Sequence, residues 1–388
     1  MKNRLLHVIV WKLVRWPFKA VMRLKYNFRT EAYTVKGPAI ILSNHTSNTD
    51  PMMVGGAFRR QMYFVANDSL VNDPRFFVRA MCFLQAPIGR QKAGSGAGTI
   101  KAILRVLKEG CNVCLFPEGN TTWDGVTRPV PAATAKLVRS SGATLVTYRL
   151  EGTYLHNPRW ALKSKRRGEC RGHVVGIYTP EELKAMSNSQ VMNIINKDLH
   201  YDAIEEQKKN PREFTGKNLC AGIDTLLYYC PACGAMHTIR GEGDFVRCTA
   251  CGASAKMNSF ALLEGGEFKV DNVRDWYALQ KEKLASVIEE SGEIFRDRDF
   301  TLYELESGGS KRRIAGGDIS LNKTALSLPG EVSIPLTDLS GMSNFKSTDL
   351  FLRTAEGTRY LLKAKEICCT SKYIDACTML GCNVGLGI

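Results

Sequence analysis

The sequence contains no apolar run long enough to cross a membrane. Residues 1–28 are apolar but carry Lys or Arg at positions 12, 15, 19, 23 and 25, and the longest uncharged run there is Leu5 to Trp11. A membrane-spanning helix needs roughly 20 consecutive apolar residues. No small-residue cleavage site follows this segment, so we expect neither a transmembrane helix nor a cleaved signal peptide.

Acidic residues are scarce relative to basic ones. The 388 residues include 53 Lys and Arg but only 38 Asp and Glu, a formal net charge of +15. This surplus favours an anionic partner: nucleic acid, anionic lipid or a phosphorylated substrate. The hydrophobic fraction of 44% and the mean hydropathy of −0.17 indicate a packed protein, long enough for two or three domains.

The cysteines are odd in number, thirteen in all, which disfavours a complete disulfide framework. Four of them form two Cys-x2-Cys pairs, Cys230/Cys233 and Cys248/Cys251, each followed by Gly and separated by fourteen residues. This spacing is typical of a zinc ribbon, so we predict a structural zinc in a reducing compartment. His237 lies between the pairs, and we expect it at the surface because four thiolates already complete the site.

The N-terminal segment is amphipathic if it forms a helix. Around such a helix, basic side chains lie along one arc and apolar side chains occupy most of the rest of the circumference. Three aromatic residues lie in the same segment. The basic residues are Arg4, Lys12, Arg15, Lys19 and Arg23, and the aromatic ones are Trp11, Trp16 and Phe18. This pattern predicts a helix in an anionic membrane interface, bent at Pro17. The alternative is an amphipathic helix docked on its own domain.

Strand-like and helix-like stretches alternate from about residue 31 to 206, which predicts an α/β domain with a largely parallel sheet. The predicted strands are Ala39–Ser43, Met62–Ala66, Leu84–Ile88, Asn112–Phe116, Thr144–Leu150 and His173–Tyr178. The predicted helices are Asp73–Phe83, Gly98–Glu109, Ala132–Ser140 and Pro180–Gln207.

His45 and Asp50 follow the first predicted strand, where open α/β sheets bind their ligands. Asp50 and Pro51 open a predicted helix, with Asp50 as its N-cap. One interpretation is that Asp50 orients His45, whose other ring nitrogen then acts as a general base. The other is an N-cap beside an unrelated loop histidine.

Two further loops at predicted strand ends carry candidate chemistry. The first is Phe116-Pro-Glu-Gly-Asn-Thr-Thr122, whose backbone amides can face an anionic ligand, unless it is an ordinary acidic turn. The second is Ile88-Gly-Arg90, in which Arg90 either grips a phosphate or forms a surface ion pair.

In this order, the His-x4-Asp, Gly-Arg and Phe-Pro-Glu-Gly blocks resemble the glycerolipid acyltransferases, the superfamily of the lysophosphatidic acid acyltransferases. A fourth block, an apolar strand, is expected where Thr144–Tyr148 stands, and the resemblance covers about residues 30–185. It implies that His45 is the base and Asp50 the acid that orients it. The substrate-binding residues it implies are Arg90, Phe116, Pro117, Glu118, Gly119, Asn120 and Thr121.

The resemblance also implies the reaction. An acyl group passes from acyl-CoA or acyl-ACP to the free hydroxyl of a lysophospholipid, with 1-acyl-glycerol-3-phosphate as the first choice, in phospholipid biosynthesis. The base contributes ~10²–10⁴-fold to such a step, and no catalytic metal is required. The implied location is the cytoplasmic face of a membrane, as a peripheral protein on an anionic surface.

One departure from the family pattern concerns the acceptor. Phosphate-binding members usually continue the third block with Thr-Arg-Ser, whereas this chain has Asn120-Thr121-Thr122. Losing a charge-assisted bond weakens phosphate binding by about 1.5–3 kcal/mol unless another cation replaces it. The candidates are Arg128 and the cluster Arg159, Lys163, Lys165, Arg166 and Arg167. The alternative acceptor is a different lysolipid or a glycolipid that Asn120 and Thr121 bind by hydrogen bonds.

The C-terminal part is rich in short strands and ends in a helix-like stretch, Ser371–Leu380, which resembles a pleckstrin-homology-like barrel. The predicted organisation is a membrane-interface helix (1–30), an acyltransferase domain (31–210), a zinc ribbon (218–262), a helical linker (270–290) and a β-rich domain (291–388). A non-catalytic adaptor that binds lipid and protein is the alternative. Nucleic acid is not an expected partner, because Cys230–Cys251 contains only Arg240 and Arg247 as cations.

Overall fold

The structure, a computed structural model, describes residues 4–67, 82–83, 87–90, 96–162, 164–306, 310–330, 332–345 and 348–384. It divides into two compact units. The first comprises residues 1–159, 166–215 and 387–388, and the second residues 160–165 and 216–386. Within the described ranges, no helix combines the length and the apolar character that a membrane span requires. Most of the predicted helix Asp73–Phe83 and the start of the predicted strand Leu84–Ile88 lie outside the described residues.

The first unit is built on a mixed, mostly parallel sheet of seven described strands. Its strands are β1 (Phe28–Thr30), β2 (Ala39–Ser43), β3 (Met62–Asn67), β4 (Ile88–Arg90), β5 (Asn112–Leu115), β6 (Thr144–Glu151) and β8 (Cys170–Tyr178). Their order is β1-β8-β6-β2-β5-β3-β4. The five strands from β6 to β4 run parallel, while β8 runs antiparallel to β6. The predicted α/β class is confirmed.

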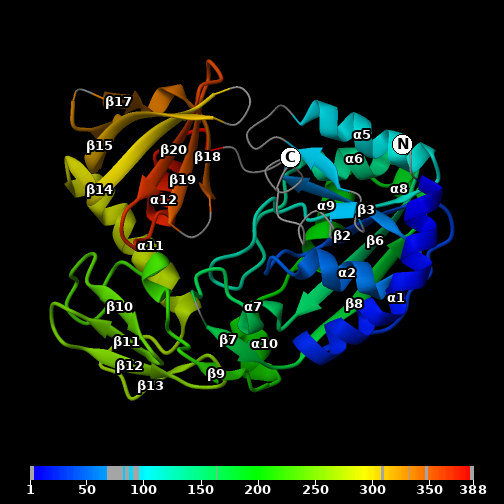
Figure 1. The fold of residues 1–388 in the computed structure, drawn as a ribbon, viewed down its shortest axis with the longest axis horizontal. Helices are drawn as coiled ribbons and strands as arrows, with labels where there is room; N and C mark the ends of the chain where they lie inside the picture. Colours follow the sequence, from blue (N-terminus) through cyan, green and yellow to red (C-terminus); the bar gives the residue numbers. More distant parts are fainter. Residues whose placement is uncertain are drawn as a thin grey trace. The chain divides into compact units, whose positions relative to one another are not determined.

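Helices cover both faces of this sheet (Figure 1). One face carries α1 (Arg4–Tyr26) and α2 (Asp50–Ala57), and the other carries α5 (Ala97–Lys108), α6 (Ala133–Ser141), α8 (Pro180–Ala185) and α9 (Asn188–Leu199). Side chains alternate across a strand, so Ile40 and Leu42 of β2 share one core with Ile103 of α5 and Ile195 of α9. Two short helices, α7 (Thr153–His156) and α10 (Ala203–Lys209), complete the described part of this unit.

The prediction of a single helix over Pro180–Gln207 is wrong, because three helices occupy this stretch. Ser187 and Asp202 each start a new one. The Ser187 side chain accepts a hydrogen bond from the Gln190 N–H, and Asp202 accepts from Ile204 and Glu205. Such caps satisfy the backbone donors that the first turn of a helix leaves without partners.

The second unit holds two antiparallel sheets. The smaller contains β10 (Ile239–Glu242), β11 (Phe245–Cys248), β12 (Ser254–Met257) and β13 (Leu263–Glu264). The larger has the order β17-β16-β15-β14-β20-β19-β18. Its strands are β14 (Glu293–Leu305), β15 (Lys311–Asn322), β16 (Ala325–Leu328), β17 (Val332–Pro335), β18 (Leu339–Phe345), β19 (Asp349–Thr354) and β20 (Arg359–Ala364). Two helices, α11 (Val273–Glu290) and α12 (Ser371–Met379), lie in this unit. A separate two-stranded sheet pairs β7 (Lys165–Arg167) with β9 (Thr215–Lys217).

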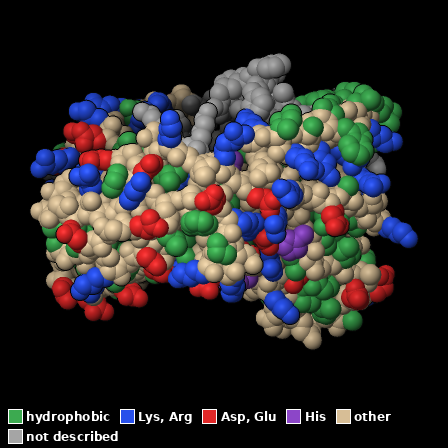
Figure 2. Space-filling view, turned by 90° about the horizontal axis from the view of Figure 1, so that it is seen from below, with side chains coloured by type: hydrophobic (Ala, Val, Ile, Leu, Met, Phe, Trp, Pro, Cys, Tyr) green, Lys and Arg blue, Asp and Glu red, His purple; other side chains and the backbone are tan. Residues whose placement is uncertain are grey.

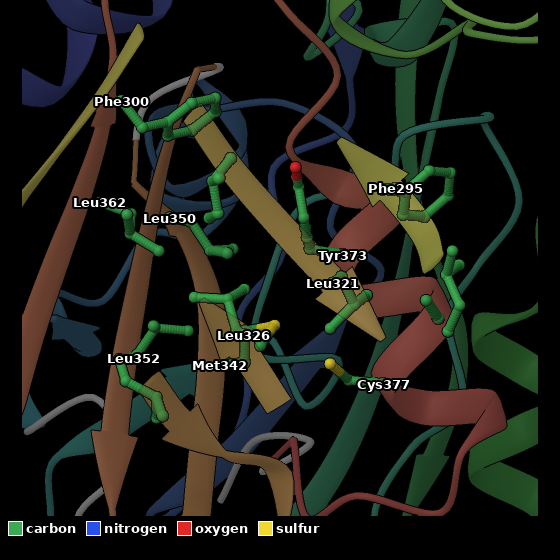
Figure 3. Close-up of a cluster of buried hydrophobic side chains, with 14 of the residues drawn as sticks. Phe295, Phe300, Leu321, Leu326, Met342, Leu350, Leu352, Leu362, Tyr373 and Cys377 are labelled. Carbon is green, nitrogen blue, oxygen red and sulfur yellow. The ribbon is translucent and has the colours of Figure 1, made fainter. Parts of the chain in front are cut away.

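The larger sheet and α12 enclose a hydrophobic core (Figure 3). Tyr373 and Cys377 of α12 face side chains of the strands such as Phe300 and Leu350. Tyr228, two residues before the first Cys-x2-Cys pair, belongs to the same core. The β-rich character predicted for the C-terminal region is confirmed, and its likeness to a pleckstrin-homology barrel stays a prediction.

A buried lysine joins the ribbon segment to the larger sheet within this unit. The Lys372 Nζ lies 2.6 Å from Asp297 Oδ2 and 2.8 Å from Nδ1 of His237. Burial by itself raises the pKa of Asp297, but hydrogen bonds from His237 and Lys372 and the charge of Lys372 outweigh it and hold this pKa well below its usual range. His237 is only partly exposed, because it belongs to this cluster.

Candidate active site and metal centre

Three loops meet at one edge of the first unit's sheet because β2 lies between β5 and β6 and runs parallel to both. Leu42 pairs with Leu115 of β5, and Ser43 pairs with Tyr148 of β6. The carboxyl ends of these strands therefore point the same way. The following loops begin at residues 44, 116 and 152, and the first two hold the predicted site.

His45 and Asp50 are in direct contact. The Nδ1 of His45 lies 3.0 Å from Oδ2 of Asp50, whose side chain is fully buried. The same oxygen accepts the backbone N–H groups of Thr46 at 2.6 Å and Ser47 at 2.8 Å. With a carboxylate at Nδ1, the neutral ring carries its proton on that nitrogen and leaves Nε2 unprotonated.

The prediction that Asp50 is the N-cap of its own helix is wrong. Thr49 occupies that position, and Asp50 is the first residue of α2. Its carboxylate turns back to the preceding loop, so it holds the loop backbone and the His45 ring together instead of capping the helix.

Glu118 is buried beneath the same loop. Its Oε1 accepts the N–H of His45 at 2.6 Å, and its Oε2 accepts the N–H of Arg128 at 2.7 Å. Burial raises the pKa of Glu118 to about 8, and the hydrogen bonds from Arg128 and His45 offset this only in part. Both carboxylate oxygens are thus bonded to backbone donors, and the predicted role in binding the acceptor stays a prediction.

The rest of the third block wraps around His45. The ring of Phe116 stacks on the imidazole, with centroids 4.4 Å apart and an interplanar angle of 25°. Thr122 donates its N–H to the His45 carbonyl at 3.0 Å. Gly119 has φ +74°, which favours glycine, and its N–H closes the turn on the Phe116 carbonyl. Pro117 is buried.

The remaining predicted substrate-binding residues lie on the same block or at the end of β4. Asn120 is half-buried and Thr121 is buried. Arg90 ends β4, and the structure describes its backbone but not its side chain. Whether these residues bind substrate stays a prediction.

Two residues that the sequence did not single out support the site. The side-chain amide of Asn44 donates to the Leu150 carbonyl at 2.9 Å and accepts the Leu150 N–H at 2.8 Å, which ties the His45 loop to β6. The hydroxyl groups of Thr46 and Thr153 are in hydrogen-bond contact. Asn44 directly precedes His45 and was within reach of sequence reasoning, whereas nothing in the sequence points to Thr153.

Among the candidate replacement cations, Arg159 reaches the third block. Its Nη1 donates to the Thr121 carbonyl at 3.0 Å. Arg166 is buried and Arg167 is exposed. Lys163 and the side chain of Lys165 lie outside the described residues.

The four predicted metal ligands converge in the second unit. The Sγ atoms of Cys230, Cys233, Cys248 and Cys251 all lie within 4.8 Å of one another. Two of the separations, Cys230 to Cys251 and Cys233 to Cys248, are 3.8 Å. A tetrahedral zinc with Zn–S bonds of about 2.3 Å spaces its sulfurs about 3.8 Å apart. The cluster therefore fits a closed, structural zinc site.

The first unit thus brings a histidine–aspartate pair to the carboxyl edge of an α/β sheet. Residues 23–151 match the family model described as Acyltransferase. The chain is 28% identical over 121 residues to the 1-acyl-sn-glycerol-3-phosphate acyltransferase of Borreliella burgdorferi, a match over 30% of this chain and 47% of the relative. It therefore spans about half the length of that relative.

A solved structure is also similar: the 1-acyl-sn-glycerophosphate (LPA) acyltransferase PlsC from Thermotoga maritima. The TM-score is 0.39 and the identity 16%, over 50% of this chain and 80% of that chain. The resemblance read from the motifs is confirmed by the family match: residues 23–151 of the first unit carry an acyltransferase domain.

Replacing Glu118 with Gln should change how stability depends on pH. The folded state raises this pKa from 4.5 to about 8, so the folded protein holds the proton more tightly than the unfolded chain. Between about pH 5 and 8, the wild-type free energy of unfolding should therefore fall as pH rises, by up to about 1.4 kcal/mol per pH unit from this group. Urea denaturation of both proteins at pH 5, 6.5 and 8 measures this. A difference between them that does not change with pH would contradict the prediction.

Metal analysis of protein purified without chelators should find about one zinc per chain. The Cys248→Ser variant should lose it, because a structural site needs all four thiolates. Cys382→Ser is the matched control, since this half-buried cysteine lies outside the cluster and should leave the zinc content unchanged. A wild-type protein that carries neither zinc nor iron would refute the site.

Proposed function

We propose that this protein transfers an acyl group from acyl-CoA or acyl-ACP to the free hydroxyl of a lysophospholipid, with 1-acyl-glycerol-3-phosphate as the acceptor. The observation that carries the proposal is the His45–Asp50 contact of 3.0 Å inside an acyltransferase domain. The name of the Borreliella relative supports the choice of acceptor.

The geometry suits general-base catalysis. In the proposed step, Nε2 of His45 takes the proton of the acceptor hydroxyl while the hydroxyl oxygen attacks the thioester carbonyl carbon. The Asp50 carboxylate stabilises the imidazolium at Nδ1. When the tetrahedral intermediate collapses, the C–S bond breaks, the ester remains, and the leaving thiolate takes the proton from His45. Backbone N–H groups of the third block are the candidate donors to the oxyanion.

We further propose that α1 attaches the protein to the cytoplasmic face of a membrane. One face of α1 packs on its own unit through Trp11 and Met22, both buried. The opposite face leaves Leu13, Trp16 and Leu24 exposed by 72%, 68% and 77%. Both interpretations of the amphipathic pattern therefore have support, because one face is docked and another is left open.

Basic residues lie beside this apolar stripe. Lys12 and Arg23 of α1 are exposed. Each cation near an anionic membrane surface contributes about 1 kcal/mol, in addition to the burial of the apolar side chains. Figure 2 shows Lys and Arg interspersed with Asp and Glu on the face that it displays, so net charge alone does not mark a membrane-binding surface there.

Acyl transfer from a labelled thioester to lysophosphatidic acid tests the catalytic assignment. His45→Ala should lower kcat by ~10²–10⁴-fold because it removes the base, and Asp50→Asn should lower it substantially. His200→Ala, at an exposed position, is the matched control and should keep wild-type activity. A folded His45→Ala protein that retains most of the activity would overturn the mechanism.

Vesicle sedimentation tests the role of α1. The double variant Leu13→Glu/Trp16→Glu should bind anionic vesicles much more weakly than the wild type, because it places two acidic groups on the apolar stripe. High salt should weaken binding of the wild type. The control is Ile177→Glu, which changes an exposed apolar residue of β8. Equal, salt-insensitive binding by all three proteins would place the anchor elsewhere.

A further inference from the structure

Arg159 comes from the loop after β6 and α7, yet its guanidinium lies on the third block. The bond from Nη1 to the Thr121 carbonyl holds it there, and its Cζ lies 4.5 Å from the centroid of the Trp123 ring. Thr122, the residue between these two contacts, donates its N–H to the carbonyl of His45. Arg159 thus contacts the two residues that flank Thr122, whose N–H holds the backbone of the candidate base, His45.

The ring beneath Arg159 is firmly placed. Trp123 is buried, and its carbonyl accepts the hydroxyl of Tyr154 at 3.0 Å. Tyr154 in turn packs so closely on Gly125 that a Cβ at this glycine would lie 2.8 Å from its ring. A planar guanidinium stacks on the face of such a ring, so this position suits arginine better than lysine.

The acidic groups of the same loop are already engaged. Both oxygens of Glu118 accept backbone N–H groups. One oxygen of Asp124 accepts the Thr122 hydroxyl at 2.7 Å and the Val126 N–H at 3.2 Å. These bonds direct the two carboxyl groups into the loop itself.

We propose that Arg159 recognises the anionic headgroup of the acceptor and so determines specificity for phosphate-bearing over neutral lysolipids. This assignment rests on the proposed acyl transfer and deepens it. A guanidinium matches a phosphate group in shape and charge, and this one contacts the third block from the loop that follows α7. It supplies a positive charge beside Asn120, Thr121 and Thr122, a segment that has none of its own.

Steady-state kinetics with two acceptors, lysophosphatidic acid and neutral monoacylglycerol, test the proposal. Arg159→Gln should raise KM for lysophosphatidic acid about 10–100-fold while kcat changes less than about threefold, and it should leave the kinetics with monoacylglycerol unchanged. Arg159→Lys should show a smaller rise, because it keeps the charge but not the planar stack. Arg105→Gln, at an exposed arginine of α5 paired with Glu109, is the control and should behave as the wild type. Equal losses on both acceptors, or no change with lysophosphatidic acid, would overturn the assignment.

Calorimetric binding without an acyl donor separates this proposal from the function it rests on. Wild-type protein should bind lysophosphatidic acid at least tenfold more tightly than monoacylglycerol, and Arg159→Gln should abolish that preference. Inorganic phosphate should bind far more weakly, which would identify the lipid headgroup and not free phosphate as the ligand. If this selectivity appears without acyl transfer, the proposed function fails and the role of Arg159 stands. If acyl transfer occurs and Arg159→Gln leaves the selectivity intact, the proposed function stands and the role of Arg159 fails.

Discussion

The parallel pairing of β2 with both β5 and β6 is the constraint on which the candidate site depends. Every side chain of β2 is buried, so the strand needs helices on both faces and a neighbour on each edge. Once these neighbours run parallel to it, three loops must emerge at one edge of the sheet. His45, the third block and Arg159 are then within reach of one another, although up to 114 residues separate them in the chain.

Two buried carboxylates fix the loop of His45 in different ways. Asp50 binds the imidazole and two backbone N–H groups, whereas Glu118 binds the backbone of His45 and Arg128. Burying an acid is unfavourable unless hydrogen bonds satisfy it, so each of these residues imposes one loop geometry on its donors. The Phe116 ring and the Thr122 N–H complete the enclosure, and the imidazole keeps little freedom to leave it.

The second unit shows how a small ribbon can be integrated into a larger fold. Gln280 of α11 accepts the Tyr228 N–H at 3.2 Å and donates to the Leu226 carbonyl at 2.9 Å, and Tyr228 lies in the core of the larger sheet. The Lys372–Asp297 pair adds a contact from α12 to His237, inside the ribbon segment. Metal binding by the cysteines would therefore order more than the ribbon alone, because the segment leading into the first pair is part of the core.

The sequence by itself determined the features that depend on neighbouring residues: the strand before His45, the turn at Gly119 and the two Cys-x2-Cys-Gly pairs. Each follows from side-chain periodicity or backbone freedom within a few positions. Helix boundaries were less certain, because Ser187 and Asp202 interrupt a stretch whose apolar pattern reads as continuous. Only the tertiary structure decided the partners of Glu118, the backward turn of Asp50 and the arrival of Arg159 at Thr121. The partners of Glu118 and Arg159 depend on which strands are neighbours in the sheet. Asp50 turns back because the folded loop presents a histidine and two backbone donors to it. A one-dimensional pattern encodes neither the strand order nor the fold of the loop.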